Sequence, residues 1–155
     1  TVVTDYIDWT RHQPATFSAD KHVHMISHAD TESKLPGPPF CPQINAALGQ
    51  VLPLIPQVVY LGVDGPRRET AAEARMFRLL GADVVGSNLT PEAALANELG
   101  LCFAGLVTIG NRSADQPMLD PQGELRTGLE ATLQALPDFI RVLDTLPVCL
   151  CAGED

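Results

Sequence analysis

Residues 58–86 read VVYLGVDGPRRETAAEARMFRLLGADVVG, and this stretch decides the fold. The apolar run 58–63 is typical of a buried strand, and residues 83–85 predict a second, short strand. Between them, a T-x-x-E capping box that starts at Thr70 predicts a helix, which Gly81 ends. A strand, a helix and a second strand in this order predict a βαβ unit with parallel strands.

The segments upstream of this unit extend the pattern. Residues 1–9 (TVVTDYIDW) read as a strand that runs into a loop, and residues 22–27 (HVHMIS) predict another strand. A Pro- and Gly-rich insertion at 31–39 separates them from a helix predicted over 43–54, where apolar residues recur at helical spacing.

The downstream segments repeat the alternation. Thr90 and Pro91 predict a helix with Thr90 as its N-cap, and Gly100 closes it. The almost unbroken apolar run 101–109 is typical of a central strand, and residues 124–146 predict a long final helix. The whole succession predicts an α/β sandwich with a mostly parallel sheet.

Composition narrows the class of protein. The 155 residues are 45% apolar and 19% charged, which suits one folded domain and excludes a disordered chain. Asp and Glu outnumber Lys and Arg by 19 to 10, so a broad basic face for nucleic acid is not expected. The sequence contains neither a membrane-length apolar run nor a recognisable secretory signal, so we expect no membrane association and a cytoplasmic protein.

The cysteines and histidines raise the question of a metal site. Cys102 lies in an apolar run and is expected to be a buried thiol. Cys149-x-Cys151 could bind a metal or form a redox pair, but its spacing differs from C-x-x-C and no second ligand pair is evident. Four histidines between residues 12 and 28 lack an accompanying carboxylate cluster. The prediction is therefore no metal.

Three polar segments follow predicted strands, and ligands of α/β sheets bind at such carboxyl ends. Residues 64–70 supply two cations and Glu69, which could equally be a solvated helix start. Residues 86–90 could offer N–H groups to an anion or sugar, or form a simple turn. Asn111, in the segment 110–116, could read a planar amide-like ligand edge or form an Asx turn. Three such loops at one edge favour a ligand site.

Several motifs, in the same order along the chain, resemble the signature of a known family. Residues 65–73 (GPRRETAAE), 79–86 (LLGADVVG) and Pro91-Glu92 resemble the signature of the trimeric purine nucleoside phosphorylases and methylthioadenosine phosphorylases. The segments DYIDWT (5–10), PATF (14–17) and FCP (40–42) look most like the methylthioadenosine and methylthioinosine branch, so the resemblance covers nearly the whole chain.

This resemblance implies a fold, a reaction and partners. The fold would be an α/β sandwich around a mixed, partly barrel-like sheet, with residues 1–155 as the carboxyl-terminal portion of a single domain. The reaction would be phosphorolysis of a purine nucleoside to the free purine and a pentose 1-phosphate. Phosphate would be a co-substrate, and no metal or organic cofactor would be needed. Partners would be an amino-terminal fragment of the same fold and two further copies of the complete unit.

The resemblance also assigns roles to individual residues. Glu69 would accept a hydrogen bond from N1–H of the base, and Asn111 would read N7 and O6, which favours a 6-oxopurine, with a 5′-methylthioinosine-like substrate preferred. Ser87 and Asn88 match positions that hold ribose hydroxyls and phosphate, and Gln122 falls near the position that faces the 5′ substituent.

Two further residues are expected at a subunit boundary. Met25 and Phe40 lie near the segment that, in the family, completes the pocket of a neighbouring subunit.

The sequence also departs from the family pattern. Arg68 occupies the aromatic base-stacking position, and Ser87-Asn88-Leu89 replaces a Met followed by two hydroxyl residues. These changes keep two alternatives open: a purine-binding protein or non-catalytic subunit on the same fold, and a hydrolytic nucleosidase.

Overall fold

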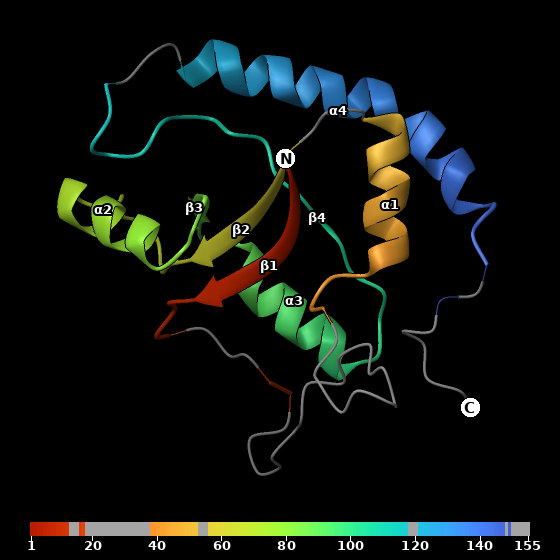
Figure 1. The fold of residues 1–155 in the computed structure, drawn as a ribbon, viewed down its shortest axis with the longest axis horizontal. Helices are drawn as coiled ribbons and strands as arrows, with labels where there is room; N and C mark the ends of the chain where they lie inside the picture. The colour runs from red at the N-terminus through yellow and green to blue at the C-terminus, as the bar shows by residue number, and fades with distance from the viewer. Residues whose placement is uncertain (13–15, 18–37, 53–55, 118–120, 148, 150–155) are drawn as a thin grey trace.

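A computed structural model of the protein describes residues 1–12, 16–17, 38–52, 56–117, 121–147 and 149. Within this part of the chain, strands and helices alternate much as the sequence predicts (Figure 1). The elements are β1 (Val2–Asp8), α1 (Pro42–Val51), β2 (Gln57–Gly62), α2 (Ala71–Leu79), β3 (Val84–Gly86), α3 (Leu89–Glu98), β4 (Gly105–Leu106) and α4 (Pro121–Leu143).

The described strands form one mixed sheet in the order β3-β2-β1-β4. β1, β2 and β3 are parallel, with Tyr6 opposite Tyr60 and Tyr60 opposite Val84. β4 runs antiparallel to β1, with Val3 opposite Gly105. The expected mixed α/β architecture is therefore confirmed, and the carboxyl ends of β2 and β3 share one edge of the sheet.

Helices surround this sheet on several sides. α3 contacts β1 and β2, and α1 contacts both β1 and α4. α2 lies at the end of the molecule toward which β1 and β2 point (Figure 1). Among the described helices, none combines enough length with low enough polarity to cross a membrane.

The core lies between β1, β2 and α3 and includes Phe40, which is 1% exposed. The Phe40 ring stacks on Phe103 with centroids 6.1 Å apart and meets Tyr6 edge-on at 6.0 Å. Burial of large aromatic rings at such spacings contributes strongly to stability. Phe40 therefore packs inside this chain, and its role at a subunit boundary stays a prediction.

Capping residues set the start of α2 and the carboxyl-terminal ends of α2 and α3. The Thr70 hydroxyl accepts a hydrogen bond from the Glu73 N–H at 3.2 Å, and the Glu73 carboxylate accepts one from the Thr70 N–H at 2.8 Å. This reciprocal pair confirms the predicted capping box. Gly81 and Gly100 adopt φ values of +93° and +67° at the two helix ends, a conformation that favours glycine.

The predicted start of α3 is wrong by two residues. Asn88, not Thr90, is the N-cap, and Thr90 is fully buried inside the first turn. The Thr90 side chain fills the space beside Gly62, where a Cβ would collide with it. The Asn88 N–H instead donates to the Tyr60 hydroxyl at 3.3 Å. Packing against the glycine of β2 thus displaces the expected capping role of Thr90.

The predicted strand 101–109 is also too long. Only Gly105 and Leu106 pair in the sheet, and Leu101 and Ile109, at the ends of the run, are 54% and 41% exposed. The Phe103 carbonyl instead accepts from the N–H of Cys41 at 2.7 Å, outside the ladder. The strand predicted at 22–27 lies outside the described residues.

Candidate active site

A cavity of about 680 Å³ opens at the carboxyl ends of β2 and β3. It lies between segments that are far apart in sequence, and all three predicted strand-end loops contribute to its wall. Arg68, Glu69, Ser87 and Asn111 are among the lining residues. A volume of this size is ordinary for a pocket that encloses a small organic ligand.

Glu69 connects two of the loops. Its side chain is 14% exposed, and its Oε1 accepts a hydrogen bond from the Ala114 N–H at 3.2 Å. The same oxygen lies 3.8 Å from Nη2 of Arg68. Oε2 of Glu69 accepts no hydrogen bond from the residues that the structure describes, so this oxygen can accept a donor from a ligand.

Asn111 and Arg68 converge on one carbonyl oxygen. Nδ2 of Asn111 donates to the Arg112 carbonyl at 2.9 Å, and Nη2 of Arg68 donates to the same oxygen at 3.4 Å. A side-chain amide has two N–H donors and one oxygen acceptor. Its second N–H and its Oδ1 therefore have hydrogen-bonding capacity for a ligand in the cavity.

Ser87 and Asn88 form a short polar chain after β3. The Ser87 hydroxyl donates to Oδ1 of Asn88 at 2.9 Å, while the Asn88 N–H donates to Tyr60. Gly86 makes this arrangement possible, because a Cβ there would overlap the Tyr60 hydroxyl. Ser87 lines the cavity, whereas the neighbouring Asn88 is not part of the lining.

The sequence analysis missed an ion pair between Arg78, which lines the cavity, and Asp115, which does not. Arg78, in the last turn of α2, donates through both terminal nitrogens to Asp115, at 3.0 and 3.1 Å. The Ser113 hydroxyl also donates to Asp115 at 2.6 Å. The hydrogen bonds from Arg78 and then Ser113 lower the pKa of Asp115 to about 2. Helical spacing marks Arg78 only as a cation in the last turn, so the sequence does not reveal this partner.

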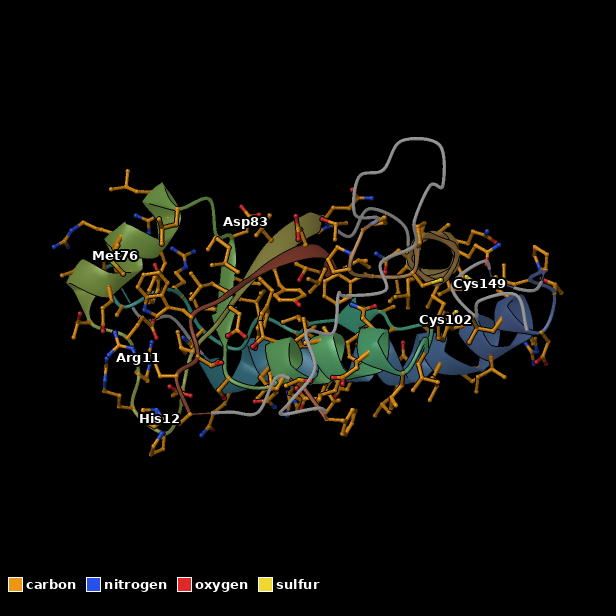
Figure 2. The ribbon with its side chains drawn as sticks, turned by 90° about the horizontal axis from the view of Figure 1, so that it is seen from below. Arg11, His12, Met76, Asp83, Cys102 and Cys149 are labelled. Carbon is orange, nitrogen blue, oxygen red and sulfur yellow. The ribbon has the colours of Figure 1, made fainter. Side chains whose placement is uncertain are left out.

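Other polar groups of the predicted loops have structural partners. Asp64 lies outside the cavity lining and accepts from the Arg11 N–H at 2.9 Å, with Nδ1 of His12 3.4 Å away. Figure 2 places Arg11 and His12 at the same end of the molecule as Met76 of α2. Asp64 therefore holds the segment after β1 against the first loop.

The remaining predicted site residues are not brought to the cavity. Gln122 is exposed in the first turn of α4, and neither it nor Phe40 lines the cavity. Met25 lies outside the described residues. The structure thus gathers four of the eight named residues, with Asn88 adjacent to them, while their roles toward a ligand remain predictions.

Comparison with known proteins identifies a matching family and related sequences. Residues 1–142 match the Phosphorylase superfamily. A probable S-methyl-5′-thioinosine phosphorylase from Methanosarcina acetivorans is 41% identical over 97% of this chain and 58% of its own length. An S-methyl-5′-thioadenosine phosphorylase from Nitrosopumilus maritimus is 30% identical over 96% of this chain and 57% of its own length. The chain thus spans less than two thirds of these curated relatives.

Solved structures agree on the fold. A mutant adenosine/methylthioadenosine phosphorylase from Schistosoma mansoni, crystallised with adenine, superposes with a TM-score of 0.79. The alignment covers 94% of this chain and 60% of that one, at 19% identity. The likeness at this identity concerns the arrangement of strands and helices.

Proposed function

This chain belongs to the Phosphorylase superfamily, and we propose that it carries the base-binding portion of an enzyme that cleaves purine nucleosides by phosphorolysis. The reaction transfers the pentosyl group from a purine nitrogen to inorganic phosphate. The names of the two relatives, a thioinosine and a thioadenosine phosphorylase, support this reaction class. The single observation that carries the proposal is that Glu69 and Asn111 line one cavity from two separate loops.

The chemistry of these two groups suits a departing purine. As C1′ gains oxocarbenium character, negative charge develops on the base, and donors placed near N7 stabilise it. The second N–H of Asn111 can donate to N7 without ionising. Oε2 of Glu69 can accept from N1–H at the opposite edge of the ring. The Asn111 donor therefore stabilises the leaving group more as the bond breaks, whereas the Glu69 carboxylate orients and selects the base.

The same pair favours a 6-oxopurine. An ionised carboxylate only accepts hydrogen bonds, so Glu69 suits a base that carries N1–H, as hypoxanthine and guanine do. Adenine has a lone pair at N1 in place of an N–H, so neither this nitrogen nor the Glu69 carboxylate would find a hydrogen-bond donor. The 41% identity to the thioinosine phosphorylase supports this choice, and we propose a 5′-methylthioinosine-like substrate.

Phosphate binding and assembly involve more than this chain. We assign Ser87 and Asn88 to the ribose and phosphate side of the site, and Gln122 to the 5′ side. An amino-terminal portion of the fold completes the phosphate site, and three complete units form the assembly, with Met25 and Phe40 near the boundary. The reaction itself uses no metal or organic cofactor. Sedimentation that shows only single units at micromolar concentration would contradict the trimer.

One observation favours a second candidate, a purine-binding protein without turnover. Arg68 stands at a base-stacking position and shares the Arg112 carbonyl with Asn111, so a cation lies beside the proposed base site. Glu69 and Asn111 argue against this candidate, because both groups retain capacity for the base.

Product analysis of the complete assembly separates the candidates. The assembly is mixed with 5′-methylthioinosine, with and without inorganic phosphate, and ³¹P NMR follows the pentose 1-phosphate. We expect the sugar phosphate and free hypoxanthine in equal amounts, and neither product without phosphate. Release of hypoxanthine without phosphate would instead indicate a hydrolase. Saturable binding without any product would indicate the non-catalytic protein.

A further inference from the structure

Three cysteines from distant parts of the chain converge at one place. Cys41 is the N-cap of α1, Cys102 precedes β4, and Cys149 follows α4. Their sulfur atoms all lie within 4.8 Å of one another, and Sγ of Cys41 is 3.4 Å from Sγ of Cys149. All three are thiols in the structure, as predicted for Cys102, although Cys102 is only partly buried where its apolar run predicts a buried side chain.

This cluster is separate from the proposed active site. None of the three cysteines lines the cavity that contains Glu69 and Asn111. Figure 2 shows Cys102 and Cys149 close together at the end of the molecule opposite Met76. The proposed reaction uses no thiol, so these side chains need a different explanation.

The spacing of the sulfurs suits a thiophilic cation. A tetrahedral zinc ion bonds each sulfur at about 2.3 Å, which sets the sulfurs roughly 3.8 Å apart. That separation falls within the observed arrangement, between the 3.4 Å of one pair and the 4.8 Å limit of all three. A disulfide would use only two of the three groups, whereas one ion can contact all of them.

The surroundings hold the ligands in place. The N–H of Cys41 donates to the Phe103 carbonyl at 2.7 Å, which fixes the backbone beside Cys102 against the start of α1. Cys41 is 0% exposed and is the N-cap of α1, so its position is set by the start of that helix. A preformed, partly buried set of soft ligands is what a structural zinc site requires.

We propose that Cys41, Cys102 and Cys149 bind one zinc ion, which ties the segment after α4 to α1 and to the segment before β4. On binding, three S–H bonds break, three Zn–S bonds form and three protons pass to the buffer. A water molecule or another side chain completes the tetrahedron. The ion serves the fold and takes no part in the proposed reaction.

Metal binding is tested on the complete assembly, purified with a reductant and without metal. Zn²⁺ is titrated and the bound metal is measured after dialysis for wild type, Cys102→Ser and His12→Ala. His12 is a potential ligand with an 81% exposed side chain, so this variant controls for adventitious binding. We expect one zinc ion per chain in wild type and in His12→Ala, and at least ~10-fold weaker binding in Cys102→Ser.

Two measurements on wild type avoid dependence on a variant that misfolds. Co²⁺ should give the intense charge-transfer absorption of thiolate ligation, and Zn²⁺ should protect the partly exposed Cys102 and Cys149 from alkylation in peptide maps. Absence of stoichiometric zinc, or equal alkylation with and without zinc, overturns the proposal. A Cys41–Cys149 disulfide in the isolated protein, combined with no zinc binding after reduction, also overturns it and assigns the cluster to redox chemistry.

Discussion

The carboxylate of Glu69 accepts a hydrogen bond from the backbone N–H of Ala114 at 3.2 Å, although 45 residues separate them in sequence. This contact joins the loop after β2 to the loop after β4. The loop that it holds contains Asn111, so the two proposed base-reading residues are positioned with respect to each other. A change at Glu69 is therefore expected to affect both the contact with the base and the position of the second loop.

Changing Asn111 to Asp should alter the choice of base. A carboxylate cannot donate to N7, but it can accept from a 6-amino group or from a protonated N7. We expect the preference for 6-oxopurine over 6-aminopurine nucleosides to fall by at least ~10-fold, which is about 1.4 kcal/mol. Competition between inosine- and adenosine-type substrates measures this ratio. The exposed Gln50→Glu variant in α1 makes the same amide-to-acid change far from the cavity and should leave the ratio unchanged.

The ion pair between Arg78 and Asp115 should appear in the pH dependence of stability. The pKa of Asp115 is lowered from 3.8 to about 2, so the folded state favours the ionised form. The stabilisation is therefore present above pH 4 and is lost as the pH falls toward about 2. Carboxyl NMR titration should show the pKa of Asp115 rising toward 3.8 in Arg78→Met.

Glu73 supplies an internal control in the same titration. Its pKa is also about 2, but the first cause is the hydrogen bond from Arg67. The pKa of Glu73 should therefore stay low in Arg78→Met. If Asp115 titrates at the same pH in both proteins, the assigned cause is wrong.

Gly86→Ala should lower the stability of the fold through a clash next to the candidate site. A Cβ at Gly86 would collide with the Tyr60 hydroxyl, which accepts from the Asn88 N–H. We expect a loss of about 1–3 kcal/mol in the free energy of unfolding, measured by denaturant titration. Gly49→Ala is the matched control, because, apart from its chain neighbours and the backbone of its own helix, no atom of the described residues lies within 4 Å of the added Cβ. Since Gly49 is inside α1, that change should stabilise by roughly 0.5–1 kcal/mol. Equal effects of the two substitutions would contradict the packing described for Gly86.

Residues 1–155 produced alone should associate. α4 exposes an apolar stripe at helical spacing, with Leu125, Leu129, Leu133, Leu136 and Ile140 each between 46% and 58% exposed. Such a surface promotes aggregation unless another segment covers it. Sedimentation velocity should show large species, which Leu129→Glu with Leu133→Glu reduces. Coproduction with the amino-terminal portion should give one compact assembly. A monomer that melts cooperatively by itself would contradict this expectation.

Local signals predicted much of this fold. The Thr70 capping box, the glycines at 81 and 100 and the apolar run of β2 each depend on residues close in sequence, and the structure confirms them. Thr90 shows the limit of such signals. Its side chain packs on Gly62, a contact between two elements that capping statistics do not include.

The site was predictable as a group of loops but not in its detail. The parallel strands β2 and β3 bring their carboxyl ends together, so the convergence of Glu69 and Ser87 on one cavity follows from topology. Asn111 follows the short antiparallel strand β4, so its place in the same cavity depends on the path of the chain after that strand. The partners Arg78–Asp115 and Glu69–Ala114 depend on the exact path of residues 110–116. The cysteine cluster likewise joins three segments whose proximity no sequence spacing reveals.

The central claim is that Glu69 and Asn111 read the base of a 6-oxopurine nucleoside during phosphorolysis. Its most direct test is the ratio of kcat/KM for 5′-methylthioinosine and 5′-methylthioadenosine at saturating phosphate, measured for wild type and Glu69→Gln. We expect wild type to favour the thioinosine. Glu69→Gln should reduce kcat/KM for it by roughly 30- to 1,000-fold, or about 2–4 kcal/mol, and lower the ratio. A wild type that favours the thioadenosine, or a ratio that Glu69→Gln leaves unchanged, would contradict the account.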